Sequence, residues 1–96
     1  MKKYEIMYIV RPTVSEEELA NVTKKFNDIL NTKDSKVVNV TEMGQRELAY
    51  EIKKFRSGYY YVVDVEAKND SAIKEFDRLA LISADIIRHL ITKKED

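Results

Sequence analysis

A chain of 96 residues has room for one domain with one modest hydrophobic core. It contains no cysteine, which excludes a disulfide framework and a thiolate metal site. Lys plus Arg (17) equals Asp plus Glu (17), so the formal net charge is zero, whereas a protein that binds RNA alone is usually clearly basic. No apolar stretch is long enough to span a bilayer, and Met1-Lys2-Lys3 leads directly into a strand pattern, so a cytoplasmic protein without membrane association is expected.

The first third of the chain predicts a strand followed by a helix. Residues 4–10 alternate with a period of two, and Arg11-Pro12 ends that strand because proline has no backbone donor. Ser15 and Glu18 have the spacing of a capping box, after which Leu19, Val22, Phe26, Ile29 and Leu30 recur at helical spacing. The acidic triplet 16–18 is explained by the positive end of the helix dipole, and a metal site is the weaker interpretation.

The middle of the chain predicts a long hairpin. An alternation that begins at Val38 and Val40 continues through Leu48, Tyr50 and Ile52, which indicates one long strand that Gly44 can bend or bulge. Residues 54–58 (KFRSG) are short, basic and closed by glycine, as in a turn, and residues 59–66 alternate as the return strand.

The last third predicts a second helix and a final strand. Residues 69–71 (NDS) cap a helix with an apolar stripe over residues 73–80. Residues 86–91 form a short strand, and a charged tail starts at about residue 92.

The order strand, helix, strand, strand, helix, strand predicts an α+β fold over residues 1–96 as one domain. We expect a ferredoxin-like βαββαβ arrangement, with a four-stranded antiparallel sheet and two helices on one face. Right-handed crossovers place the first and third strands in the middle. This fold by itself does not define a function.

Short motifs in the hairpin and around it form a set of residues with different chemistry. They are Gly44, the run 46–50 (RELAY), Ile52-Lys53, Tyr4-Glu5, Arg11-Pro12, Gly58-Tyr59 and Arg88. This set resembles the signature of the bacterial small-ribosomal-subunit protein six family over essentially the whole chain. The resemblance implies the same fold and a structural, non-enzymatic protein without cofactor or small-molecule substrate. It implies a protein that binds the central domain of small-subunit ribosomal RNA together with small-subunit protein eighteen.

Catalytic chemistry has little support in the residues themselves. His89 is the one histidine, and the chain has neither a glycine-rich phosphate loop nor metal-ligand spacing. Residues 56–62 loosely resemble the aromatic motif of RNA-recognition domains, but Tyr60 and Asp64 occupy positions where that motif needs a small residue and an aromatic one. We therefore reject a base-stacking sheet.

Two surfaces are predicted instead. Clustered cations are the expected phosphate contacts, which position a protein without reading sequence. They are Lys2, Lys3, Arg46, Lys53, Lys54, Arg56, Arg88 and Lys93.

The sheet face away from the helices is the expected protein-docking surface, because apolar residues there have an acidic border that suits a basic partner. Its predicted members are Glu5, Met7, Ile9, Ala49, Tyr60 and Val62, bordered by Glu47, Glu51, Asp64 and Glu66. Leu48 and Tyr50 are expected in the core. A small homodimeric ligand-sensing or protein-interaction module, with the open sheet pairing to itself, remains the alternative.

Overall fold

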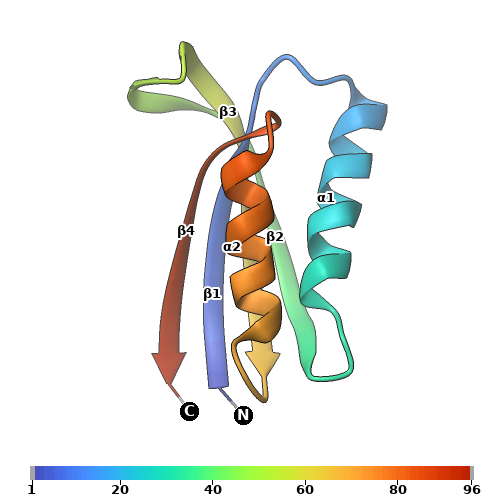
Figure 1. Ribbon diagram of the computed structural model, residues 1–96. Helices are drawn as coiled ribbons and strands as arrows, with labels where there is room; N and C mark the ends of the chain where they lie inside the picture. The colour runs from blue at the N-terminus through green and yellow to red at the C-terminus, as the bar shows by residue number, and fades with distance from the viewer. Residues whose placement is uncertain (1, 96) are drawn as a thin grey trace.

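A four-stranded antiparallel sheet with both helices on one face makes up the protein (Figure 1). The computed structural model describes residues 2–95. Its elements are β1 (Lys2–Val10), α1 (Glu16–Leu30), β2 (Ser35–Ile52), β3 (Phe55–Ala67), α2 (Ser71–Ile82) and β4 (Ile86–Glu95). The strand order β2-β3-β1-β4 places β1 and β3 in the middle, so the predicted ferredoxin-like fold is confirmed.

Aromatic side chains form the centre of the core between sheet and helices. The Tyr8 ring from β1 stacks on Tyr61 from β3 at 5.3 Å between centroids. Phe26 from α1 and Phe76 from α2 lie 6.1 and 5.7 Å from Tyr8 and 5.4 Å from each other. These rings therefore join both helices to the two central strands.

Both helices begin where the sequence predicts. Ser15 Oγ accepts a hydrogen bond from the Glu18 amide at 3.1 Å, and Glu18 Oε1 accepts one from the Ser15 amide at 3.2 Å. This capping box starts α1. The helix buries Val22, Phe26 and Leu30 against the sheet. At α2, Asn69 Oδ1 accepts from the Ser71 amide at 3.0 Å, while the N-cap residue Asp70 makes no side-chain capping bond.

Three irregularities in the pairing of β2 overturn the prediction of an unbroken alternation. The pairing with β3 skips one residue after Val37 and another after Glu42, and its register shifts again between Glu47 and Ile52. Val38 and Met43 are the inserted residues, and both are exposed. Gly44 follows at φ 80°, in the left-handed region that glycine adopts without strain, so the predicted bulge at this glycine is confirmed. Because the insertion at Met43 moves later side chains to the other face, residues near Leu48 no longer follow the parity of Val40.

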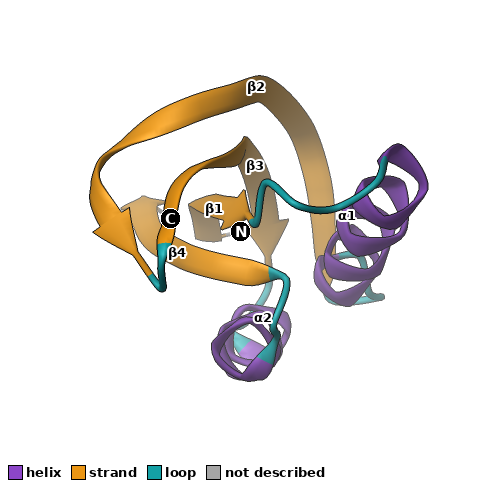
Figure 2. Cartoon of the chain, turned by 90° about the horizontal axis from the view of Figure 1, so that it is seen from above, coloured by secondary structure: helices purple, strands orange, loops and turns teal. Residues whose placement is uncertain are grey.

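The hairpin turn is shorter than predicted, and the arm beyond it bends over the sheet. Lys53 and Lys54, at φ 51° and 72°, form a two-residue turn, and β3 begins at Phe55. Gly58 thus lies inside β3, not in the turn. The end of the hairpin crosses the sheet face opposite α2 and approaches the start of β4 (Figure 2).

The final strand is longer than expected. β4 extends from Ile86 to Glu95, and Thr92, Lys93 and Glu95 pair with β1, so the predicted charged tail from about residue 92 is wrong for those positions. Asp96 lies outside the described residues. No helix in the described part of the chain has the length and apolar character needed to cross a membrane.

Candidate nucleic-acid and protein interfaces

The predicted cations separate into two groups at opposite ends of the sheet. Lys2 and Lys3 start β1, and Lys93 lies beside them because it pairs with Tyr4 across β1 and β4. We call Lys2, Lys3 and Lys93 the terminal cluster. Both chain ends lie at this end of the molecule (Figure 1).

The second group surrounds the hairpin and is called the hairpin cluster. It consists of Arg46, Lys53, Lys54, Arg56 and Arg88. Arg88 joins it because it pairs with Ile9 at the far end of β1. Lys3 and Ile9 lie six positions apart along β1, which corresponds to about 20 Å of strand. Arg88 therefore does not form one patch with Lys93, although the two share a strand.

Two members of the hairpin cluster hold the arm against the sheet. Lys53 Nζ donates to the Ile86 carbonyl at 3.4 Å, and Arg88 Nη1 donates to the Tyr50 hydroxyl at 2.8 Å. Arg46 Nε donates to the Met43 carbonyl at 3.2 Å, which keeps that guanidinium beside the second bulge. The cations are thus positioned by short-range contacts within the arm and at the start of β4.

The open sheet face, meaning the face away from the helices, carries both carboxylates and lysines at its terminal end. Glu66 on β3 faces Lys3 on β1. Glu5 and Asp64 face each other across β1 and β3. Lys94 Nζ lies 3.3 Å from Glu5 Oε2 and 3.7 Å from Asp64 Oδ1, and the hydrogen bond to Glu5 raises the pKa of Lys94. Lys94 offsets the repulsion of the opposed carboxylates, a role that strand spacing alone did not reveal.

Apolar residues occupy the centre of the open face, with one correction to the predicted set. Met7, Tyr60 and Val62 are half-buried there, as is Glu5 at the terminal end. Ile9, in contrast, is only 2% exposed, because the hairpin arm folds over it. The prediction that Ile9 contacts a partner is therefore wrong for the molecule in this conformation. Ala49 is exposed, within the arm itself.

The bent arm encloses a hollow of about 120 Å³ on the open face. Its lining consists of Met7, Ile9, Leu48, Ala49, Tyr50, Ile52, Tyr60 and Arg88. Tyr50 is 63% exposed, so its predicted place in the core is wrong, and Leu48 is half-buried beside this hollow and outside the main core. The insertion at Met43 accounts for the error, since continuing the parity of Val40 without it assigns Leu48 and Tyr50 to the helix side.

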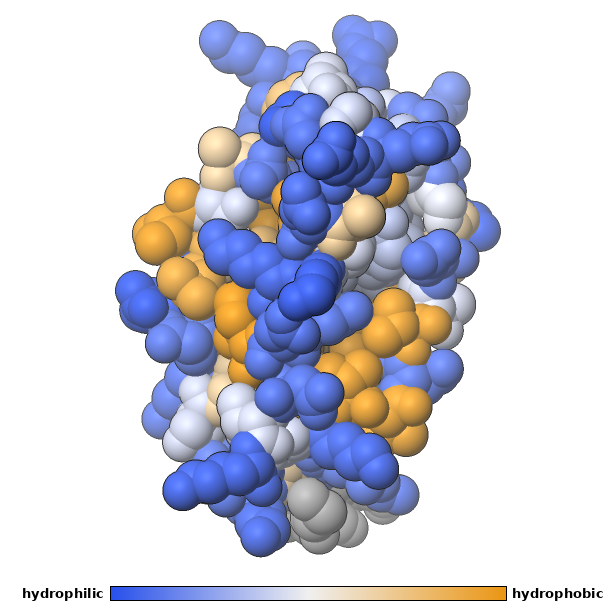
Figure 3. Space-filling view, turned by 90° about the vertical axis from the view of Figure 1, so that its right-hand side faces the viewer, coloured by the Kyte–Doolittle hydropathy of each residue, from blue (hydrophilic) through white to orange (hydrophobic). Residues whose placement is uncertain are grey.

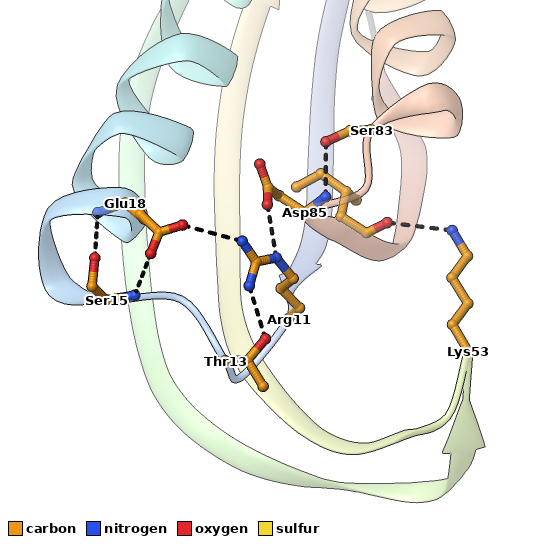
Figure 4. A network of polar contacts seen from close by, with 8 residues as sticks. Arg11, Thr13, Ser15, Glu18, Lys53, Ser83 and Asp85 are labelled. Carbon is orange, nitrogen blue, oxygen red and sulfur yellow. Dashed lines mark hydrogen bonds and ion pairs between the residues drawn. The ribbon is translucent and has the colours of Figure 1, made fainter.

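A charged network that the sequence analysis did not assign fixes the loops at the hairpin end (Figure 4). Arg11 Nε donates to Asp85 Oδ1 at 2.8 Å, and its other nitrogens reach Thr13 Oγ1 at 2.8 Å and Glu18 Oε2 at 3.2 Å. The hydrogen bond to Asp85 raises the pKa of Arg11, and hydrogen bonds from the Ser15 backbone and side chain, more than Arg11 itself, lower the pKa of Glu18. The capping box and the start of β4 are thereby joined through one guanidinium. No local sequence signal links Arg11 with Asp85, because the two residues lie 74 positions apart in the chain.

On the helix side, cations are paired with carboxylates nearby in the chain, among them Lys74 with Asp70 at 3.4 Å and Arg78 with Glu75 at 2.6 Å. Viewed from the α1 side, hydrophilic side chains run down the middle of the molecule with apolar side chains on either side (Figure 3). The lysine Lys24 on α1 is paired with Asp28 at 3.0 Å. His89 faces this side, with Nε2 2.6 Å from Asp77 Oδ1. Within residues 2–95, no group of three or more His, Cys, Asp or Glu side chains is arranged to hold a metal ion.

Comparison with known proteins places these surfaces in context. The family model for Ribosomal protein S6 matches residues 3–93. The chain belongs to this family. A crystal structure of 30S ribosomal protein S6 from Thermotoga maritima superimposes with a TM-score of 0.88 at 32% identity, covering 97% of this chain and 87% of that one. A small-ribosomal-subunit protein is thus established, and the family prediction from the RELAY motif is confirmed.

A more distant match shows the fold alone. The Arabidopsis thaliana protein At3g17210 superimposes with a TM-score of 0.57 at 12% identity, covering 100% of this chain and 95% of that one. The architecture is therefore shared by chains with little sequence similarity, and the surfaces described above have to carry any functional argument.

Proposed function

We propose that this chain binds the central domain of small-subunit ribosomal RNA as one half of a complex with small-subunit protein eighteen. Membership of a small-subunit ribosomal protein family supports an RNA-associated role. The zero net charge supports a shared one, because few phosphates can be neutralised by a chain without excess cations.

The observation that carries the proposal is the arrangement of the open face. The carboxylates Glu5, Asp64 and Glu66 lie at the terminal end beside Lys3 and Lys94, and Arg88 lies at the hairpin end, with Met7 and Val62 between them. An apolar centre bordered by carboxylates suits a partner that brings complementary cations, since complementary potential favours the correct partner and orientation. In this proposal the partner covers Glu5, Met7, Tyr60 and Val62.

The cations are the proposed RNA contacts, and their separation sets the geometry. The terminal cluster and the hairpin cluster stand about 20 Å apart along the strands, within a molecule 37 Å long. An RNA that touches both has to pass along one edge or end of the sheet, beside the bound protein partner. The RNA and the partner then share a boundary, which favours joint binding.

A filter-binding titration of a central-domain RNA fragment tests the proposal. The chain alone is expected to bind weakly, and the addition of small-subunit protein eighteen is expected to give tight, salt-sensitive binding. Lys2→Ala with Lys3→Ala should flatten the salt dependence of the joint complex by about one unit of slope for each lost phosphate contact. Lys24→Ala, on the outer side of α1, is the matched control. Tight capture of RNA by the lone chain, or a stable homodimer that ignores both partners, would contradict the proposal.

A further inference from the structure

The hollow under the hairpin arm differs in chemistry from the rest of the open face. Of the eight described residues that line it, seven carry no charge and the eighth is Arg88. The carboxylates Glu5, Asp64 and Glu66, with their neighbours Lys3 and Lys94, belong to the other end of the same face. Cations of a protein partner therefore find carboxylates at that end and none among the residues that line the hollow.

Tyr50 stands at this hollow in a fixed orientation. Its ring is 63% exposed, yet its hydroxyl accepts a hydrogen bond from Arg88 Nη1 at 2.8 Å. An exposed aromatic ring held in this way loses little conformational entropy when a ligand packs on it. The guanidinium of Arg88 keeps further N–H donors that can bind a phosphate oxygen.

The turn that closes the arm adds positive charge next to the ring. Lys53 and Lys54 occupy the turn itself, and Lys53 Nζ reaches the Ile86 carbonyl at the start of β4. Proteins that bind unpaired nucleotides combine an exposed aromatic ring with an apolar surface beside it and several cations around it. The base stacks on the aromatic ring while the cations follow the backbone.

We propose that Tyr50 stacks on an unpaired base of the bound ribosomal RNA, with Arg88 on the adjacent phosphate. The site takes a single-stranded nucleotide from a loop or bulge, because a base within a duplex presents no free face. Stacking occurs at the hairpin, and the flat centre of the sheet takes no part in it. This inference rests on the proposed function, since it assigns a residue-level contact within the same RNA complex.

Two substitutions at Tyr50 separate stacking from its alternatives in the complex of the chain, small-subunit protein eighteen and a central-domain RNA fragment. Tyr50→Leu keeps apolar bulk but removes the ring, and is expected to weaken RNA binding about five- to 150-fold. Tyr50→Phe keeps the ring and is expected to bind within about twofold of the unchanged chain. Leu81→Ala, an exposed apolar position on α2, is the matched control and should have no effect.

Chemical probing of unpaired bases in the same complex gives a second readout. One base should be protected by the unchanged chain and by Tyr50→Phe, but not by Tyr50→Leu. Equal losses for Tyr50→Phe and Tyr50→Leu would overturn stacking in favour of the hydroxyl contact to Arg88. Weaker binding of the Tyr50→Leu chain to protein eighteen without RNA would assign the hollow to the protein interface and overturn the proposal. If RNA and partner bind the unchanged chain and Tyr50→Leu alike, the stacking inference fails while the proposed function stands.

Discussion

Gly58→Ala tests whether β3 and β1 are as tightly packed at the root of the hairpin arm as the structure indicates. A Cβ atom at Gly58 would overlap Ile9 Cγ2, lie 2.9 Å from the Val10 carbonyl oxygen and lie 3.4 Å from Ile87 Cδ1. The carbonyl is backbone and cannot move without disturbing the β1–β3 ladder, so the methyl group is an overpacking substitution. Such changes cost about 1–3 kcal/mol.

For a domain of this size, a loss of 1 kcal/mol lowers Tm by about 4–8 °C, so thermal and urea unfolding can both measure the effect. Gly58→Ala should also cost about 1 kcal/mol less in an Ile9→Leu background, which moves the branch away from the new methyl group and is itself well tolerated. Gly44→Ala is the matched control. It meets no atom within 4 Å but is strained at φ 80°, so its cost should not depend on residue 9. Equal losses for Gly58→Ala in both backgrounds would refute the packing argument.

Three further predictions concern the core, the helix start and the turn. Tyr8→Phe should leave urea stability unchanged or raise it by up to about 1 kcal/mol, because the buried Tyr8 hydroxyl has no hydrogen-bond partner among the described residues. Burial raises the pKa of Tyr8, so the folded state holds that proton more tightly, and stability should fall as pH rises above the ordinary tyrosine value of about 10. Tyr8→Phe should reduce this alkaline loss, and an identical alkaline profile would contradict the assignment. Hydrogen bonds from Ser15 lower the pKa of Glu18, so its stabilisation is present above the ordinary glutamate value and lost as pH falls. Glu18→Gln should therefore flatten the acid side of the stability profile, whereas Glu17→Gln, the adjacent control, should not. Lys53→Asn with Lys54→Gly places residues that favour positive φ in the turn, so stability should rise by a few tenths of a kcal/mol or more while the salt slope of RNA binding falls. A loss of stability in that double variant, measured by urea unfolding, would show that the lysines stabilise the turn.

Much of the architecture could be predicted because its signals are local or topological. The capping box at Ser15, the apolar stripe of α1 and the element order depend on residues close in sequence, and the crossover rule then assigns β1 and β3 to the middle. The family motifs around Gly44 were equally local. These features required no knowledge of how distant segments fold over one another.

The failures have a different physical origin. An inserted residue in a strand leaves no mark in a period-of-two pattern, so the bulge at Met43 reversed the assigned faces of Leu48 and Tyr50. Ile9 does lie on the predicted face, but the arm that buries it comes from about 40 positions later in the chain. The strand β4 extends beyond Ile91 because pairing with β1 outweighs the weak strand preference of its lysines. In each case tertiary contacts decided what the local pattern left open.

The irregular path of β2 also affects whether this edge of the sheet can pair with another molecule. At 18 residues this strand forms one border of the sheet, where exposed backbone groups would otherwise template pairing with another molecule. Its insertions divide the border into runs such as 39–42 and 44–47, too short and too twisted relative to each other for a second strand to align along the whole length. The bulges in β2 thus have a second effect besides changing which side chains face the core. They make this edge of the sheet a poor template for pairing with another chain.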